Sequence, residues 1–224
     1  MSAMEPGRRP GSALRSKRIE EDRTKEIVDA CERLYAATGF HAVSLRDIAR
    51  ETSMSRPSVY NYFRTKEEIF LALFAREYDR WNDSLEEICR GNRKLSVRVL
   101  AEKLAKSLAV RPQLLKLLSM NLYDMEANSR LECLTRFKHS YGRALENMKR
   151  LLLKFRPEMT GRQIRDFIYA FFPFMFGVYP YTEVTEKQKE AMEQAGIDFE
   201  QSSARELIFT FIYNYLNKQG GSDK

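Results

Sequence analysis

Residues 44–66 read SLRDIARETSMSRPSVYNYFRTK and predict two short helices joined by a tight turn. Ser44 is a suitable N-cap for the first helix, and Asp47 completes a capping-box-like pair with it. The apolar positions of 45–49 have the spacing of one helical stripe. Ser55 can cap the second helix, whose first turn tolerates the proline found there. The stretch is therefore interpreted as a helix-turn-helix.

The second of these helices is expected to bury one face and to expose a small, polar and cationic one. Val59 and Phe63 are four residues apart and would point inward. The residues left on or beside the outer face are Arg56, Ser58, Tyr60, Asn61 and Tyr62. A short helix with such a face suits the major groove of DNA, where base edges are read.

This stretch resembles the N-terminal DNA-binding domain of the TetR (tetracycline-repressor-like) family of bacterial regulators, and the resemblance extends over residues 23–75. The family shows a Ser or Thr, an apolar-charged-Ile-Ala run, a Gly-Val-Ser turn, a Tyr-x-Tyr-Phe end to the recognition helix and then Ser-Lys-Glu-Glu. The matching residues here are Ser44, Ile48-Ala49, Ser53-Met54-Ser55, Tyr60-Asn61-Tyr62-Phe63 and Thr65-Lys66-Glu67-Glu68. Ser53 replaces the usual glycine, so the turn must avoid a positive φ or tolerate its cost. We expect an altered turn angle and an intact motif.

The residues expected to contact DNA are Ser44, Arg46, Ser55, Arg56, Pro57, Ser58, Tyr60, Asn61, Tyr62 and Lys66. Arg46 and Arg56 are the best candidates for reading bases, because arginine binds the O6/N7 edge of guanine bidentately. Either of them could instead serve phosphate alone. Pro57 and Ser58 could touch a thymine methyl or a backbone oxygen, and Asn61 could pair with adenine or phosphate.

Lys66 falls in the first turn of the next expected helix, where free backbone N–H groups and the helix dipole favour an anion. The resemblance favours a phosphate gripped by Lys66 and those amides, and the alternative is a solvated surface lysine. Tyr60 and Tyr62 could be packing residues. We expect at least one of the two to contact DNA, with one hydroxyl on phosphate and one ring partly buried.

Composition favours an all-α globular protein. The chain has 224 residues, of which 43% are hydrophobic and 31% charged, and its net charge of +7 is compatible with a nucleic-acid partner. Cys31, Cys89 and Cys133 are far apart, which predicts reduced thiols in a cytoplasmic protein and neither a disulfide framework nor a zinc site. No cofactor is expected. The apolar run 167–181 is too short to span a membrane. No nucleophile elbow, glycine-rich phosphate loop or paired carboxylates suggest an enzyme.

Three regions are expected along the chain. Residues 1–18 would be a disordered basic arm, either a solubilising tail or a segment laid on DNA, and 19–66 the DNA-binding domain. Residues 67–218 would form a helical regulatory and dimerisation domain. Its first helix would begin at Thr65, with Glu68 in a capping box, and run to about Cys89 as a lever. The helices expected besides 44–66 are 19–38, 65–89, 96–110, 112–125, 128–155, 160–179, 185–196 and 204–216. The resemblance implies about nine, three of them in the DNA-binding domain.

The helical domain is rich in aromatic residues, and the resemblance implies that its last two long helices, 160–179 and 204–216, form a homodimer interface. The remaining aromatic surface could line a cavity for a small molecule. The candidate effector-binding residues are Trp81, Met120, Tyr123, Asn128, Phe137, Tyr141, Phe172 and Phe176. The alternative for each of these residues is ordinary core or a solvated helix end.

The resemblance implies a homodimeric transcription regulator, in particular a repressor that leaves a pseudo-palindromic double-stranded operator when it binds a hydrophobic or amphipathic effector. The alternative is a DNA-bound adaptor that recruits a protein partner and has no small-molecule effector. A dry interior and an exposed apolar patch would favour that alternative.

Overall fold

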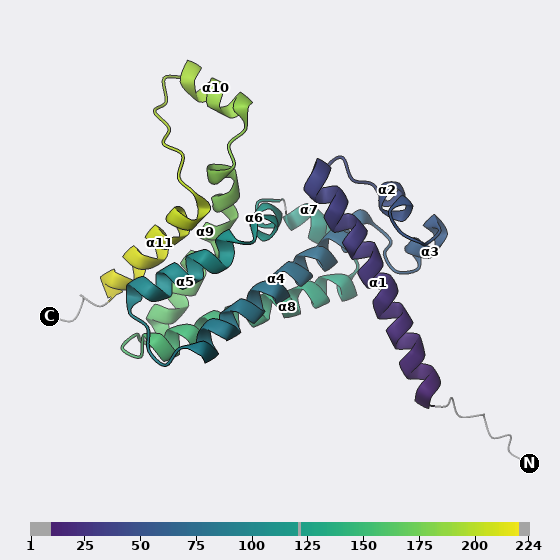
Figure 1. The fold of residues 1–224 in the computed structure, drawn as a ribbon, viewed down its shortest axis with the longest axis horizontal. Helices are drawn as coiled ribbons and strands as arrows, with labels where there is room; N and C mark the ends of the chain where they lie inside the picture. Colours follow the sequence, from purple (N-terminus) through teal and green to yellow (C-terminus); the bar gives the residue numbers. More distant parts are fainter. Residues whose placement is uncertain (1–9, 121, 220–224) are drawn as a thin grey trace, which may run out of the picture. The chain divides into compact units, whose positions relative to one another are not determined.

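The computed structural model describes residues 10–120 and 122–219, and all regular structure within these ranges is α-helical, as predicted (Figure 1). The helices are α1 (Pro10–Thr38), α2 (Leu45–Arg50), α3 (Arg56–Tyr60), α4 (Lys66–Gly91), α5 (Val97–Ala109), α6 (Pro112–Leu118), α7 (Leu122–Ala127), α8 (Leu131–Phe155), α9 (Gly161–Thr182), α10 (Glu186–Gln194) and α11 (Ala204–Gln219). None of these described helices is long and apolar enough to cross a membrane.

Helix α1 starts earlier than predicted. The expected disordered arm covered residues 1–18, but 10–18 are helical and only 1–9 lie outside the described residues. Proline is tolerated in the first turn of a helix, and a Lys17–Glu21 pair one turn apart (3.9 Å) supports the extension. At its other end α1 stops at Gly39, whose φ of +83° suits glycine, as the sequence predicts.

The described residues form eleven helices, one more than the ten ranges predicted from the sequence, because the expected helix over 112–125 is interrupted. Helix α6 ends at Leu118 and is followed by Ser119, whose side chain donates to the Lys116 carbonyl (2.8 Å); α7 begins at Leu122. A serine hydroxyl that bonds a nearby carbonyl competes with continuation of the helix. The caps predicted at Thr160 and Thr185 are both present as reciprocal capping boxes.

Residue contacts divide the chain into two compact units. The head unit comprises the residues up to Leu73 together with Met125–Cys133, and the body unit comprises 74–124 and the residues from Leu134 onward. Helices α4 and α8 therefore each contribute residues to both units. In the head unit, Tyr35 of α1 packs edge-on against Phe70 of α4, with ring centroids 5.2 Å apart.

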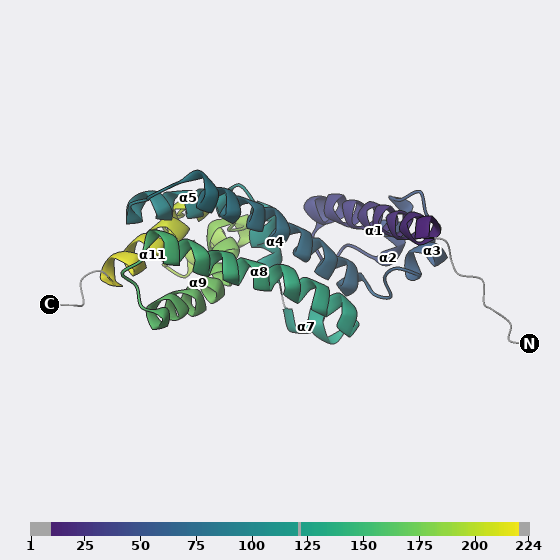
Figure 2. The ribbon, with the colours of Figure 1, turned by 90° about the horizontal axis from the view of Figure 1, so that it is seen from below.

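The body unit has an aromatic interior. In it α11 lies against α5 and α9 (Figures 1 and 2). Phe174 of α9 stacks on Phe211 of α11 with centroids 4.2 Å apart, which joins the two helices that the sequence assigned to a dimer interface. The rings of Trp81, Tyr78 and Phe172 form a second cluster that connects α4 with α9. Such packing fixes the two helices in one arrangement.

Candidate DNA-binding interface

The first helix of the motif is capped as predicted. The Ser44 hydroxyl accepts the backbone N–H of Asp47 (3.3 Å) and donates to the carboxylate of the same residue. Hydrogen bonds from Ser44 lower the pKa of Asp47, so this carboxylate stays ionised in the cap. Both hydrogen-bonding functions of Ser44 are thus used locally.

The turn forms with Ser53 in place of the usual glycine. No non-glycine residue in the described part of the chain has a positive φ, so Ser53 avoids that strain, one of the two options that the sequence left open. Its backbone N–H donates to the carboxylate of Glu26, and its hydroxyl accepts from Arg23 Nη1 at 2.8 Å. The hydrogen bond from the Ser53 N–H lowers the pKa of Glu26. Helix α1 therefore holds the turn from behind.

Helix α3 buries the side that the sequence predicts. Val59 is 1% exposed, and Phe63, which the sequence placed on the same helix, lies three residues beyond its end at Tyr60 but is also buried, with 3% exposed. At the other end Ser55 accepts the backbone N–H of Ser58 (3.3 Å), and the two hydroxyls are 2.8 Å apart. A helix of five residues is unstable by itself, so this burial and this cap are what hold it in place.

The opposite side of α3 is open to solvent. Arg56, Pro57, Tyr60 and Asn61 are exposed, whereas Ser58 and Tyr62 are half-buried. Arg56 donates to the Tyr60 hydroxyl (3.1 Å), and its guanidinium lies 5.6 Å from the centre of that ring. The pair is thus held side by side, and among the described residues no carboxylate forms an ion pair with Arg56. Arg46 and Ser55 are exposed and Ser44 is half-buried.

The structure gives Lys66 partners that the sequence did not predict. Its ammonium donates to the carbonyls of Phe40 (3.2 Å) and Val43 (3.4 Å) and lies 4.1 Å from the centre of the Phe40 ring. Lys66 thus closes the loop between α1 and α2 and is not simply solvated. An ammonium has three donors, so a phosphate contact stays a prediction.

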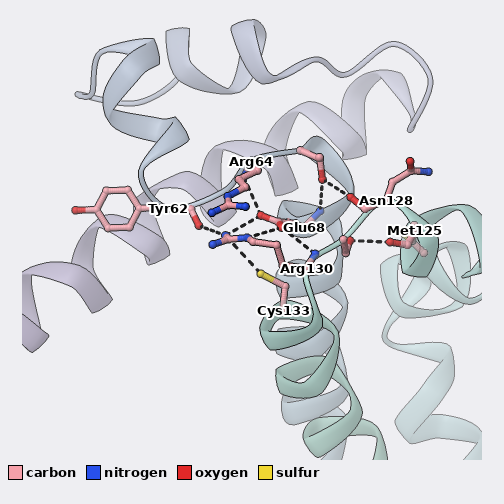
Figure 3. Close-up of polar contacts among 9 residues, drawn as sticks. Tyr62, Arg64, Glu68, Met125, Asn128, Arg130 and Cys133 are labelled. Atoms are coloured by element: carbon pink, nitrogen blue, oxygen red, sulfur yellow. Dashed lines mark hydrogen bonds and ion pairs between the residues drawn. The ribbon is translucent and has the colours of Figure 1, made fainter.

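Sequence reasoning missed the polar cluster behind α3, which is built on Glu68 and Arg130 (Figure 3). Glu68 was expected to cap its own helix reciprocally with Thr65. Only half of that cap forms, because Thr65 Oγ1 accepts the Glu68 N–H (3.3 Å) but the Glu68 carboxylate does not return the bond to Thr65. The carboxylate instead accepts the Arg64 N–H (2.8 Å) and binds the Arg130 side chain. Arg130 lies 62 residues from Glu68 in the chain, so no local sequence pattern indicates this pairing.

Burial of Glu68, which is 1% exposed, opposes its ionisation, but the hydrogen bonds that it accepts outweigh this effect. They come from the Arg130 side chain, the Arg64 N–H and the Arg130 N–H, and they lower the pKa of Glu68 to about 2. The carboxylate is therefore charged throughout the physiological pH range.

The structure brings together only some of the predicted effector residues. Trp81, Phe137, Tyr141 and Phe172 share one aromatic cluster in the body unit, and Tyr141 is its half-buried member. Tyr123 is outside it and 85% exposed. The other three predicted residues are not part of this cluster either. Met120 lies in the connection before α7, Phe176 is half-buried on α9, and Asn128 belongs to the head unit.

A groove beside the cluster was not predicted. It encloses about 370 Å³ and is lined by α4 and α5, with Ser84, Glu87, Lys103 and Arg111 among its residues. Ser107 lines the groove and accepts a hydrogen bond from Trp81 Nε1 (3.0 Å), which links it to the aromatic interior. Within the described residues, no group of His, Cys, Asp and Glu could hold a metal ion.

Two family models match the chain. The model described as "Bacterial regulatory proteins, tetR family" covers residues 27–73, and "Tetracyclin repressor-like, C-terminal domain" covers 75–208. The Fatty acid metabolism regulator protein of Bacillus subtilis is 29% identical over 62 residues, which are 28% of this chain and 32% of the relative. The repressor KstR of Rhodococcus jostii is 31% identical over 65 residues, 29% of this chain and 31% of the relative. The chain thus spans about a third of the length of these curated relatives.

Solved structures share the fold over most of the chain. The fatty acid degradation regulator FadR of Bacillus halodurans has a TM-score of 0.56 and 18% identity, covering 90% of this chain and 96% of its own. FadR of Bacillus subtilis, solved with stearoyl-CoA, has a TM-score of 0.57 and 16% identity, covering 86% and 97%. At these identities the likeness concerns the fold alone.

Proposed function

The chain belongs to the TetR family of bacterial transcriptional regulators, and from that premise we propose that it is a cytoplasmic, homodimeric repressor released from its operator by a small amphipathic molecule. It is a DNA-binding regulator and not an enzyme, as the family and the relatives are. The finer parts of the proposal concern the operator, the effector and the dimer.

The exposed face of α3 is the observation that supports DNA binding in this proposal. Arg56 and Tyr60 stand on it as a hydrogen-bonded pair, and Val59 and Phe63 fix the helix from behind. An exposed guanidinium on such a helix can bind guanine in the major groove. Two heads would read half-sites about 34–36 Å apart, which requires a pseudo-palindromic operator.

The aromatic cluster supports an apolar part of the effector. The rings of Trp81, Phe137 and Phe172 contact one another or Tyr141. A ligand that enters the cluster would therefore have to displace one ring, and Tyr141 is the candidate because it is only half-buried. A relative of the same fold binds stearoyl-CoA, an amphipathic molecule, and another bears the name of a fatty acid metabolism regulator. We therefore place the effector among molecules with a long apolar part.

Helices α9 and α11 support the dimer. Their rings at Phe174, Phe211 and Tyr215 pack together within one chain yet remain half-buried, so apolar surface is left on this helix pair. Burying that surface against a second copy would remove it from water. The proposal therefore assigns the dimer to α9 and α11.

The test starts with full-length protein and a random-sequence DNA library, from which the protein should enrich a pseudo-palindromic duplex. Fatty acids and acyl-CoA thioesters of varied chain length would then be titrated into the complex and into the free protein by calorimetry. Release of DNA by one of these compounds supports the proposal. Operator binding that no compound alters would contradict the repressor-effector reading and favour the adaptor.

A further inference from the structure

The cluster behind the recognition helix joins two segments that are far apart in the chain. Arg130 lies 68 residues from Tyr62 and 62 from Glu68, yet all three belong to the head unit. Figure 3 shows the Arg130 side chain between the Tyr62 carbonyl and the Glu68 carboxylate, while the Tyr62 ring points away from the cluster.

The guanidinium binds the carboxylate in the fork geometry that only arginine offers. Its Nε donates to Glu68 Oε1 (2.7 Å) and its Nη2 to Oε2 (2.9 Å), and the backbone N–H of Arg130 also reaches Oε1 (3.0 Å). Charge-assisted, bidentate bonds of this kind are strong and directional. Glu68 in turn accepts the Arg64 N–H at 2.8 Å.

The same guanidinium reaches the end of α3. Its Nη2 donates to the Tyr62 carbonyl at 2.9 Å, just beyond the last helical residue, Tyr60. Carbonyls at a helix end lack partners within the helix and need one from elsewhere. Arg130 and Glu68 thus fix both sides of the connection between α3 and α4, at Tyr62 and at Arg64.

A second bond ties the connection between α3 and α4 to the segment that contains Arg130. Thr65 Oγ1 donates to the backbone carbonyl of Asn128 at 2.9 Å. Arg130 immediately precedes α8, whose residues from Leu134 onward belong to the body unit. The residues that fix the end of the recognition helix are therefore continuous in the chain with a helix of the body.

We infer that Arg130 is a positioning residue for DNA recognition: by holding the Tyr62 carbonyl and the Glu68 carboxylate together, it sets the orientation of α3. This inference rests on the DNA-binding function proposed above. Base readout requires side chains held to within a fraction of an ångström, whereas phosphate attraction does not. Loss of Arg130 should therefore reduce sequence discrimination more than general affinity for DNA.

The test compares full-length wild type with Arg130→Gln, Arg130→Lys and a control, Arg143→Gln. Arg143 lies on α8 and pairs with Asp79 (3.2 Å) and Glu86 (3.3 Å) of α4 in the body unit, so its loss removes arginine–carboxylate pairs that lie outside the head unit. The probes are the duplex that wild type enriches from a random library and a scrambled duplex of the same composition. Folding at the assay temperature is checked by circular dichroism.

Arg130→Gln should lower affinity for the enriched duplex about tenfold, while affinity for the scrambled duplex changes less than about twofold. Arg130→Lys should lose discrimination too, because one ammonium cannot make the fork and reach Tyr62. Amide hydrogen exchange at residues 58–65 should rise in both variants but not in Arg143→Gln. If Arg130→Gln does not fold, the ratio of the two affinities is measured with Arg130→Lys, which keeps the charge, and this ratio tests the inference.

The inference is overturned if the ratio of the two affinities stays at the wild-type value, if Arg143→Gln lowers it equally, or if Arg130→Lys behaves as wild type. A wild-type protein that enriches no duplex at all would instead contradict the proposed DNA-binding function.

Discussion

The Glu68→Gln substitution offers a quantitative test of the head-unit cluster. The carboxylate is 1% exposed and receives hydrogen bonds from the Arg130 side chain and from the backbone N–H groups of Arg64 and Arg130. Glutamine has nearly the same shape but no charge, and its amide places a donor against one of these donors. The substitution therefore removes the ionic interaction and leaves the packing almost unchanged.

The magnitude follows from the pKa of Glu68, which falls from an ordinary 4.5 to about 2. One pKa unit corresponds to about 1.4 kcal/mol, so the ionised form favours the folded state by about 3 kcal/mol. Since Arg130 is 31% exposed, water weakens the pair, and we expect about 2–3 kcal/mol. Because the folded pKa is depressed, this stabilisation is present above pH 4.5 and is lost as the pH falls towards 2.

The assay is urea unfolding followed by circular dichroism between pH 7 and pH 2.5. At pH 7, Glu68→Gln should have a free energy of unfolding about 2–3 kcal/mol below wild type, and the gap should narrow below pH 4.5. Glu86→Gln removes a half-buried carboxylate whose partner Arg143 is 51% exposed, and it should show a much smaller gap because water screens that pair more strongly. A Glu68→Gln gap that is absent at pH 7, or constant across the acid range, would refute the reasoning.

Three further predictions concern the recognition motif. Arg56→Ala should relax base preference at one operator position by about 1–3 kcal/mol, measured with duplexes substituted base by base; equal losses on cognate and random DNA would exclude base reading. Phe63→Ala should lower the free energy of unfolding by about 3–5 kcal/mol in urea titrations, because the ring is 3% exposed, and a loss below about 1 kcal/mol would contradict its core role. Lys66→Ala should flatten the dependence of log affinity on log salt by about one unit if the ammonium also reaches a phosphate. An unchanged slope would assign Lys66 solely to the bonds with Phe40 and Val43.

Local signals predicted most of the motif. The caps at Ser44 and Ser55 and the inward positions Val59 and Phe63 depend on neighbours within one helical turn, and the structure confirms them. The stop at Gly39 is equally local. Hydrogen bonds over three or four residues are visible in a sequence because the spacing alone determines them.

Long-range pairing explains what the sequence did not show. Arg130 was not among the candidate residues because its partners lie more than sixty residues away, and Lys66 was assigned by its place in a helix rather than by the carbonyls it meets. Tyr123 and Asn128 were grouped with the aromatic interior because their segment, 120–128, mixes apolar and polar residues near the expected pocket. The break after Leu118 is an exception, because the Ser119 hydroxyl bonds the Lys116 carbonyl only three residues away and competes with the helix, and the sequence interpretation did not use this local signal.

The hydrogen bond from Trp81 to Ser107 has a practical consequence. Trp81 is the chain's only tryptophan, fully buried among Tyr78 and Phe172, and its indole N–H reaches a residue that lines the groove between α4 and α5. Indole emission shifts in wavelength when its surroundings become wetter or its N–H loses a partner. The intrinsic fluorescence of Trp81 can therefore report changes in the interior of the body unit without an added dye.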